Sequence, residues 1–546
     1  MGAASEGPRA RPGLGRATLI MGTGTSLSRV TGFIRIAVIA WAIGGAESKL
    51  PDTYQLANTL PNIVYQLILG EVLVTVFVPV FVEYLSKKGA EETRKLSSTM
   101  LALAFVVSAL VSLATVIAAP WLIKIYSFRL SGADRAAQEA VGTFFLRLFM
   151  PQMVFYATGM VLTGLLNANR RFAAPMFAPI LNNLTVIATF IAFRTIHGAE
   201  TPTLVNLATS DKLLLGLGTT AGVVAMTLAY LPSVFRLSSP FRLKDVDLRH
   251  PALRKIRSLA KWAFAYVIVN QIGLLVVKAL ANGRQGGVAA YDTSFILYSL
   301  PYGIVAVSVF TALVPSLSES FVNKDMSSFR NDFTLGLRMT SFVVMPAAAG
   351  LVALAHPLMR VFLEHGVFSA ASTDLFADTF ALMAIGLAAY AAFQQIMRAF
   401  VSMQDTKTPW IANSVGVAVN IATAIPLFFV LEVPGLGLSH ALSYIAALFA
   451  GAWLLSRRVG GLGGRALAAW HLKLMLASIA TGSVAWAVAR VIGSSVDLTE
   501  LWGQVLQVTT AIAGGTLTFL AAAALLRFDE LAMLQRMVRR AIRRAR

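Results

Sequence analysis

The stretch SLSRVTGFIRIAVIAWAIGG at residues 26–45 decides the class of fold, because it is apolar enough to span a bilayer and still contains Arg29 and Arg35. A membrane-spanning helix needs about 20 predominantly apolar residues. An arginine near the centre of a lipid-facing helix costs roughly 2.5–3.5 kcal/mol on insertion scales, so both side chains are expected to face protein or water and to have a function. The alternative for Arg29 is structural: it snorkels to the interface or pairs with a buried carboxylate.

The rest of the chain repeats this apolar pattern. It is 57% hydrophobic and 13% charged, whereas an average soluble domain is roughly 25% charged. The alternation typical of a membrane β-barrel is absent from the sequence, which therefore predicts an all-α polytopic membrane protein with about fourteen transmembrane helices. The predicted helices fall near residues 17–44, 57–84, 97–123, 140–167, 175–196, 213–235, 259–281, 288–317, 334–357, 374–402, 408–431, 436–456, 468–492 and 501–526.

The net charge of +20 follows the predicted membrane topology. When the connections are assigned alternately to two sides, 33 of the 46 Lys and Arg residues lie on one side and 10 on the other, and only Arg29, Arg35 and Arg147 lie inside helices. This positive-inside pattern predicts that both termini are cytoplasmic. Anionic lipid headgroups are the expected partners of the basic surfaces, and nucleic acid is not expected to bind.

Few residue patterns support a chemical reaction. The chain has no cysteine, which excludes disulfides, thiolate metal sites and cysteine nucleophiles. Its six histidines are scattered without ligand spacing, so neither a metal site nor a cofactor is predicted. No small-residue cleavage site follows a short apolar core near the N-terminus, so the first helix is expected to be retained.

Two pairs of segments recur at nearly the same separation. FVPVFVEYLSKKGAEETR around Pro79 resembles ALVPSLSESFVNKDMSSFR around Pro315, at an offset of 236 residues. ANRRFAAPMFAP around Pro175 resembles SMQDTKTPWIAN around Pro409, at an offset of 234 residues. Six helices therefore repeat once, and because six is even the two copies are parallel, as in transporters built from two halves. Chance similarity of short apolar segments is the alternative.

The repeat predicts two parallel six-helix lobes followed by two C-terminal helices. The longest hydrophilic connection lies between the lobes, and the chain ends in a basic amphipathic segment expected on the membrane surface. The predicted parts are a cytoplasmic basic tail (1–16), an N-lobe (17–235), a cytoplasmic interlobe linker (236–258), a C-lobe (259–457), helices 13 and 14 (466–527) and a basic amphipathic cytoplasmic tail (528–546).

The two arginines of the first helix suggest an anionic substrate. Six residues place them about 120° apart on a straight helix. A bend at Gly32, midway between them, would turn both guanidinium groups toward one cavity. Guanidinium binds phosphate through forked, charge-assisted hydrogen bonds, so we expect a substrate that carries phosphate. Asp52 and Glu71 are candidates to pair with these arginines, in a structural or a functional role.

Four segments carry a family resemblance: SRVTGFIR at 28–35, LPDTYQLANTLPN at 50–62, FVPVFVEYLSKKG at 77–89 and NRRFAAPMFAPILNN at 169–183. In order and spacing they resemble the MviN/MurJ lipid II flippases of the multidrug/oligosaccharidyl-lipid/polysaccharide exporter superfamily. The first two are fairly specific to that family. The resemblance covers helices 1 to about 12, and the additional C-terminal pair also matches.

The resemblance implies a flippase of the bacterial plasma membrane. It would move lipid II, an undecaprenyl-pyrophosphoryl disaccharide-pentapeptide, from the inner to the outer leaflet by alternating access around a cationic cavity, with peptidoglycan synthases or regulators as further partners. Helices 13 and 14 would form a groove for the lipid tail. By resemblance, Arg29 and Arg35 are the cavity arginines, Asp52 is an outer-gate acid, Asn62 is the asparagine of helix 2, and Pro175 and Asn183 are the proline and asparagine of helix 5.

The chain also departs from the family pattern. The best-known members carry a helix-2 arginine where this chain has Tyr65 and Gln66, and an arginine and a glutamate of helix 8 where it has Ile296 and Ser299. Tyr65, Gln66, Tyr298 and Ser299 are therefore expected to contact the substrate through neutral hydrogen bonds, which hold pyrophosphate less strongly than guanidinium does. No Asp or Glu lies in 259–281 or 408–431, so a sodium site known in some members is not expected.

Other functions stay open at this point. Within transport, the alternatives are export of another lipid-linked oligosaccharide or of a small cation, although a cation would need a buried acid near the arginines. From other classes, the alternatives are a non-transporting scaffold that recruits cell-wall enzymes and a membrane glycosyltransferase. A glycosyltransferase would usually have large outer loops with polar catalytic residues, whereas the longest outer connections here have about fifteen residues.

Overall fold

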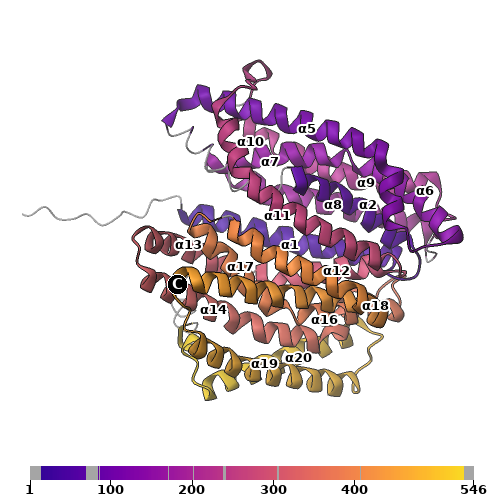
Figure 1. Ribbon diagram of the computed structural model, residues 1–546. Coiled ribbons are helices and arrows are strands. Elements are labelled where there is room, and N and C mark those ends of the chain that lie inside the picture. Colours follow the sequence, from indigo (N-terminus) through magenta and orange to yellow (C-terminus); the bar gives the residue numbers. More distant parts are fainter. Residues whose placement is uncertain are drawn as a thin grey trace, which may run out of the picture. The chain divides into compact units, whose positions relative to one another are not determined.

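The computed structural model describes residues 14–68, 81, 84, 87–169, 171–198, 200, 202–237, 241–303, 307–405 and 407–533. The regular secondary structure of these residues is entirely helical, which confirms the all-α prediction (Figure 1). The chain divides into two compact units. Unit 1 consists of Met1–Ile43, Leu56–Lys124 and Ala136–Phe264, and unit 2 of Gly44–Gln55, Ile125–Arg135 and Ala265–Arg546.

Unit 1 is a helical bundle in which α8 packs against α1, α7 and α9. Its apolar core comes from α5, α7, α8 and α10, with Met100, Leu162, Leu165 and Val234 among the buried side chains. Its helices are α1 (Leu14–Ile43), the later part of α2 (Leu50–Ile68), α5 (Gly89–Tyr126), α6 (Gly132–Phe149), α7 (Gln152–Ala168), α8 (Ala173–His197), α9 (Thr209–Leu228), α10 (Leu231–Phe235), the short η2 (Leu243–Asp245) and the first part of α11 (Pro251–Ala281).

The predicted interlobe linker, 236–258, is partly anchored to α5 in unit 1. The backbone N–H of Arg242 donates to Ser98 Oγ at 2.8 Å, and that of Asp247 donates to Thr99 Oγ1 at 2.8 Å. These bonds satisfy backbone groups that a loop would otherwise offer to water. The division between the units lies beyond this segment, inside α11.

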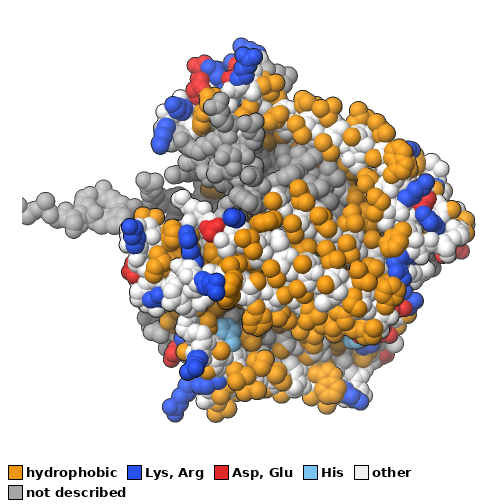
Figure 2. Space-filling model, viewed as in Figure 1, with side chains coloured by type: hydrophobic (Ala, Val, Ile, Leu, Met, Phe, Trp, Pro, Cys, Tyr) orange, Lys and Arg blue, Asp and Glu red, His pale blue; other side chains and the backbone are white. Residues whose placement is uncertain are grey.

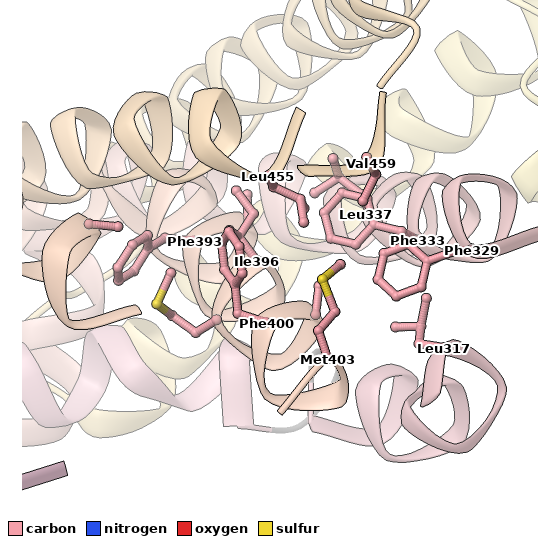
Figure 3. Packing of buried hydrophobic residues seen from close by; sticks show 14 of the residues in the cluster. Leu317, Phe329, Phe333, Leu337, Phe393, Ile396, Phe400, Met403, Leu455 and Val459 are labelled. Atoms are coloured by element: carbon pink, nitrogen blue, oxygen red, sulfur yellow. The ribbon is translucent and has the colours of Figure 1, made fainter. Parts of the chain in front are cut away.

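Unit 2 contains the remaining helices. They are the later part of α11, α12 (Gly287–Pro301), α13 (Val307–Val322), α14 (Met326–Ala353), α15 (Ala355–Leu363), α16 (Ala370–Ala384), α17 (Leu387–Ser402), α18 (Lys407–Val459), α19 (Gly464–Gly493) and α20 (Leu501–Leu525). Figure 3 shows part of the core, in which Phe329, Phe333 and Leu337 of α14 form one cluster with apolar residues of α13, α17 and α18. Helices α19 and α20 pack on each other, and α19 also packs on α14.

Helix α18 is two antiparallel helices rather than one. Its 53 residues would extend about 80 Å, far beyond the roughly 30 Å of a bilayer core. The helical backbone is broken at Glu432, where φ is 54° and ψ is −134°. Across the break, Ser439 Oγ donates to the Asn420 carbonyl at 2.8 Å. The separation predicted between helices 408–431 and 436–456 agrees with this reversal.

By length and apolar composition, nine helices of the described part qualify as membrane spans, or ten if the bent pair α16 and α17 is one span. The count is lower than the number of predicted blocks partly because α18 holds two of them. The number fourteen stays a prediction. Figure 2 shows mostly hydrophobic side chains over α16, α17 and α18, with charged side chains gathered toward the helix ends, as a lipid-facing surface requires.

Two connections that join helices of unit 1 belong to unit 2. They are Gly44–Gln55, which includes the first residues of α2, and Ile125–Arg135, which runs from the end of α5 to the start of α6. The second is held by Asn282, whose side-chain N–H donates to the Tyr126 carbonyl at 2.9 Å. The first carries three charged residues, Glu47, Lys49 and Asp52.

Candidate functional site

Arg29 and Arg35 both lie within the apolar span Thr23–Ile43 of α1. The Arg29 side chain is exposed and that of Arg35 is half-buried. No carboxylate of the described residues forms an ion pair with either. The structure thus shows no structural ion pair with a described carboxylate for either arginine, and their ligand-binding role stays a prediction.

The position of α1 is set by α8. A side chain at Gly24 would place its Cβ 2.7 Å from Met176 Cβ, so glycine is needed for this close approach of the two helices. One turn closer to the arginines, Asn183 Nδ2 donates to Ser28 O at 3.1 Å and to Thr31 Oγ1 at 3.0 Å. Asn183 therefore fixes the segment of α1 that carries Arg29.

The predicted bend at Gly32 stays a prediction. Helix α1 is continuous from Leu14 to Ile43. A Cβ at Gly32 would lie 3.5 Å from Asn183 Nδ2, which is an ordinary contact. Pro175, the other helix-5 residue of the family pattern, is buried and is the third residue of α8, since that helix begins at Ala173. Pro409 has the same place in α18, which begins at Lys407.

The predicted helix-2 residues are only partly described. Asn62 is half-buried, and its side-chain N–H donates to the Asn58 carbonyl of the preceding turn at 3.3 Å. The side chains of Tyr65 and Gln66 lie outside the described residues, as does the whole of Glu71. Their predicted roles stay predictions.

The two predicted residues of α12 differ in exposure. Tyr298 is fully buried in unit 2, where its ring lies 5.5 Å from that of Tyr390 and 5.3 Å from that of His440. In this conformation it stabilises the interior of unit 2 and offers no group to a ligand at the surface. Ser299 is half-buried, and its hydroxyl donates to the Ile296 carbonyl at 2.8 Å.

Asp52 does not pair with an arginine of α1. Its carboxylate is completely buried in unit 2 and accepts from Lys49 Nζ at 3.0 Å. It also accepts from the backbone N–H groups of Gly286 at 2.8 Å and Ala289 at 3.1 Å, at the start of α12. The sequence analysis identified Asp52 but missed Lys49, and the signal available was a lysine three residues before it, one helical turn away.

Unit 2 also contains an apolar cavity of about 720 Å³ between α14, α15, α19 and α20. Its walls include Phe342, Leu351, Leu358, Ala485 and Phe519. Among the described residues of its wall, the polar side chains are the hydroxyls of Thr481 and Thr516. Its apolar wall makes such a cavity suited to a hydrocarbon chain.

The chain was compared with known families. The family model described as lipid II flippase MurJ matches residues 40–502. The chain belongs to the lipid II flippase MurJ family. Two curated relatives bear similar names. A probable lipid II flippase MurJ of Rhizobium meliloti (strain 1021) is 26% identical over 442 residues, covering 80% of each chain. A lipid II flippase MurJ of Burkholderia cenocepacia is 29% identical over 405 residues, covering 72% of this chain and 74% of the relative.

Solved structures agree on the fold. A lipid II flippase MurJ in an inward closed conformation superposes with a TM-score of 0.73 at 21% identity, covering 94% of this chain and 99% of that one. An inward-facing multidrug resistance transporter of the MATE family, from the MOP superfamily, superposes with a TM-score of 0.66 at 12% identity, covering 79% and 95%. The MurJ fold therefore extends over nearly the whole chain.

Proposed function

We propose that this protein translocates lipid II from the inner to the outer leaflet of the bacterial inner membrane by alternating access. The observation that carries the proposal is the family match over residues 40–502. Family membership makes the protein a multi-pass membrane transporter rather than an enzyme. The orientation with both termini in the cytoplasm is part of the proposal and is supported by the distribution of Lys and Arg.

The arginines of α1 are proposed to bind the pyrophosphate of lipid II. Two guanidinium groups can each offer paired N–H donors to phosphate oxygens, which is the geometry that favours arginine over lysine in phosphate recognition. The exposure of Arg29 and the partial exposure of Arg35 support this role. Asn183 supports it indirectly, because it fixes the α1 backbone at Ser28 and Thr31.

The apolar cavity of unit 2 is proposed to hold part of the polyprenyl tail. Its position between α14, α15, α19 and α20 agrees with the expectation that the two C-terminal helices shape a groove. Gly350 lies in the wall of this cavity, and a Cβ added there would meet nothing within 4 Å. The substrate's headgroup and tail would thus be bound by different parts of the chain.

Protein partners are proposed only by class. Peptidoglycan synthases or regulators would take up or control the translocated precursor, and the basic C-terminal segment offers a cytoplasmic surface to anionic lipid.

The proposal is tested by the leaflet accessibility of lipid II in cells depleted of this protein. Depletion should leave lipid II inaccessible to an externally added enzyme that cleaves it, and re-expression should restore cleavage. If outer-leaflet lipid II stayed at the normal level during depletion, while a different lipid-linked oligosaccharide disappeared from that leaflet, the chain would be an exporter of that other substrate.

A further inference from the structure

The chain turns back directly after α20 and contacts α14 and α19 through the segment Arg527–Leu531. Arg527 has a φ of 54°, the left-handed conformation in which many helices end. The ring of Phe528 then lies 5.6 Å from the ring of Phe342 in α14 and 5.6 Å from that of Trp470 in α19. Aromatic packing therefore holds this segment on unit 2.

Two residues further on, Glu530 brings a carboxylate into the interior of unit 2. Its side chain is 2% exposed, and its Oε1 lies 2.7 Å from Nε of Arg338 in α14. Its other oxygen, Oε2, is buried and accepts no hydrogen bond from the described residues. A buried carboxylate with one oxygen unsatisfied is costly. If the segment served only to pack against the two helices, an apolar residue would be more stable at this position.

Arg338 has a second neighbour with a hydrogen-bond donor. Its guanidinium lies over the ring of Trp470, with Cζ 5.1 Å from the ring centroid. The indole N–H of Trp470 is buried and donates to no acceptor of the described residues. A guanidinium and a neutral N–H donor thus lie side by side, and such a pair can bind an oxyanion with more oxygens than Glu530 presents.

This oxyanion site lies at one end of the apolar cavity of unit 2. Phe342, in the cavity wall, is one helical turn after Arg338, and Leu531, also in the wall, follows Glu530 directly. The cavity volume of about 720 Å³ lies in the range typical of ligand pockets, roughly 300–1,000 Å³. A ligand that joins a hydrocarbon chain to a phosphate could therefore place the chain in the cavity and the phosphate at Arg338.

We propose that the cavity, Arg338 and Trp470 together bind an anionic membrane phospholipid, and that Glu530 competes with it by occupying the phosphate position when no lipid is bound. Binding breaks the contact between Arg338 and Glu530 and releases Arg527–Leu531 from the end of the cavity. The inference rests on the proposed function in two respects. A chain in the cavity is the feature that the phospholipid shares with the polyprenyl tail, and the proposed orientation places this end at the inner leaflet, which is rich in anionic lipid.

The chemistry of the site favours a phospholipid over a neutral lipid and over a soluble phosphate. A diacylglycerol would fill the cavity but offer no anion to Arg338 in exchange for Glu530. A soluble phosphate would pair with Arg338 but leave the cavity without a chain. A phospholipid does both, and the exchange of one anion for another leaves no guanidinium without a partner.

The proposal is tested by titrating the purified protein in detergent with phosphatidylglycerol and counting bound lipid by native mass spectrometry. Glu530→Gln should bind this lipid roughly tenfold more tightly than the parent, because the competing charge is lost while Arg338 remains. The matched control is Asp529→Asn, which removes the same charge from an exposed neighbour. It should bind as the parent does, whereas a general gain in attraction for anionic lipid would appear in both variants.

A double variant shows whether the gain depends on the guanidinium. Arg338→Gln combined with Glu530→Gln removes both partners, so no buried charge is left uncompensated. The tighter binding of Glu530→Gln should be lost in this variant. Dioleoylglycerol, which has chains and no phosphate, should bind Glu530→Gln and the parent equally. Glycerol 3-phosphate, which has the phosphate and no chains, should not bind either protein in the concentration range of the lipid.

Three results would overturn the inference: equal affinity of Glu530→Gln and the parent for phosphatidylglycerol, a gain that persists in the double variant, or binding of glycerol 3-phosphate as tight as that of the lipid. Should Glu530→Gln fail to assemble, Leu531→Cys gives a single thiol, since the chain has no native cysteine. Phosphatidylglycerol should raise its rate of labelling by maleimide several-fold and dioleoylglycerol should not, and an unchanged rate would count equally against the proposal. Neither measurement uses lipid II, so failure of the proposed function would appear separately, as absence of translocation by the parent.

Discussion

Helix α1 and the segment Gly44–Gln55 that follows it place their charged side chains in opposite environments. Arg29 is exposed and Arg35 half-exposed inside an apolar span, and no described carboxylate pairs with them. In the connection, Lys49 and Asp52 are buried, pair with each other and bind helix termini. Charge left open and unpaired is available to a ligand, whereas charge that is buried and compensated holds one conformation.

The largest effect should come from the open charges. Arg29→Ala and Arg35→Ala should each abolish lipid II translocation, because each removes a guanidinium that binds pyrophosphate, while the protein stays inserted and abundant. Removing an arginine from an apolar span favours insertion by roughly 2.5–3.5 kcal/mol, so loss of the protein is not expected. Complementation of depleted cells, with protein levels measured in the membrane fraction, checks this. Arg35→Lys should retain part of the activity, since it keeps the charge and loses the planar fork.

The next effect concerns the compensated charges. Asp52→Asn should destabilise the docked conformation by about 3–5 kcal/mol, because the buried Lys49 ammonium loses its counter-charge. Thermal unfolding in nanodiscs should show a lower midpoint, and translocation should fall. Glu364→Gln is the control, because its carboxylate contacts Thr373 and Arg360 rather than Lys49 or the start of α12. Equal midpoints for Asp52→Asn and the parent would remove the contrast between the two regions.

A smaller effect is expected where α8 holds α1. Asn183→Ala removes two hydrogen bonds to α1 and should cost about 1–3 kcal/mol. Translocation should fall several-fold without being abolished, since both arginines remain. Thr185→Ala lies on the same helix, but its hydroxyl bonds only the Leu181 carbonyl of α8. If Thr185→Ala impaired transport as much as Asn183→Ala, the effect of α8 on transport would not depend on the two Asn183 hydrogen bonds to α1.

Filling the apolar cavity should have a moderate effect on substrate affinity alone. Gly350→Leu adds a side chain where a Cβ has no neighbour within 4 Å, so it should occupy the cavity without a clash and leave stability unchanged or improved. The KM for lipid II in reconstituted vesicles should rise several-fold, and a short-chain analogue should be affected less. A rise in KM of the same size for both substrates would place the polyprenyl tail elsewhere.

The smallest effect is that of pH on Glu47. Its carboxylate accepts from the Ser369 N–H at 2.7 Å and the Ser372 hydroxyl at 2.6 Å. Hydrogen bonds lower its pKa from 4.5 although burial acts to raise it, so the contribution of these bonds to stability is fully present above pH 4.5 and is lost only as pH falls through the lower, folded value. Ser48 is buried, and because the chain has no native cysteine, Ser48→Cys gives a single thiol beside Glu47. Its rate of labelling by maleimide, corrected for the ionisation of the thiol, should be flat between about pH 8 and pH 6. A corrected rate that rose within this range would mean that another titrating group controls the conformation of Gly44–Gln55.

The sequence predicted the helices well because apolar length and helix breaks are local properties. The separation near Glu432 was expected between two apolar blocks, and the position of Arg29 and Arg35 inside the first apolar block was evident from the sequence. The role of Lys49 was not predicted, because its acceptors at Asn282 and Arg284 lie 233 and 235 residues further along the chain. No local sequence pattern predicts a contact between residues so far apart in the chain.

The burial of Tyr298 was likewise not predicted from the sequence. The sequence suggested a hydrogen-bonding role at the substrate, since a tyrosine lies beside the position of the family's charged residues. In the structure, side chains from α17 and α18 enclose it, including Tyr390 and His440. Which face of α12 is buried depends on helices far along the chain, so periodicity alone does not decide it.

The central claim, that the open charges of α1 bind the pyrophosphate of the substrate, is tested most directly by equilibrium binding to the purified protein in nanodiscs. Undecaprenyl pyrophosphate would be titrated against the parent, Arg29→Ala and Arg35→Ala, with undecaprenol as the ligand without phosphate. Because a hydrogen bond to a charged group contributes about 1.5–3 kcal/mol, each variant should bind the pyrophosphate roughly tenfold to a hundredfold more weakly and bind undecaprenol as the parent does. Equal affinity of all three proteins for the pyrophosphate would contradict the account.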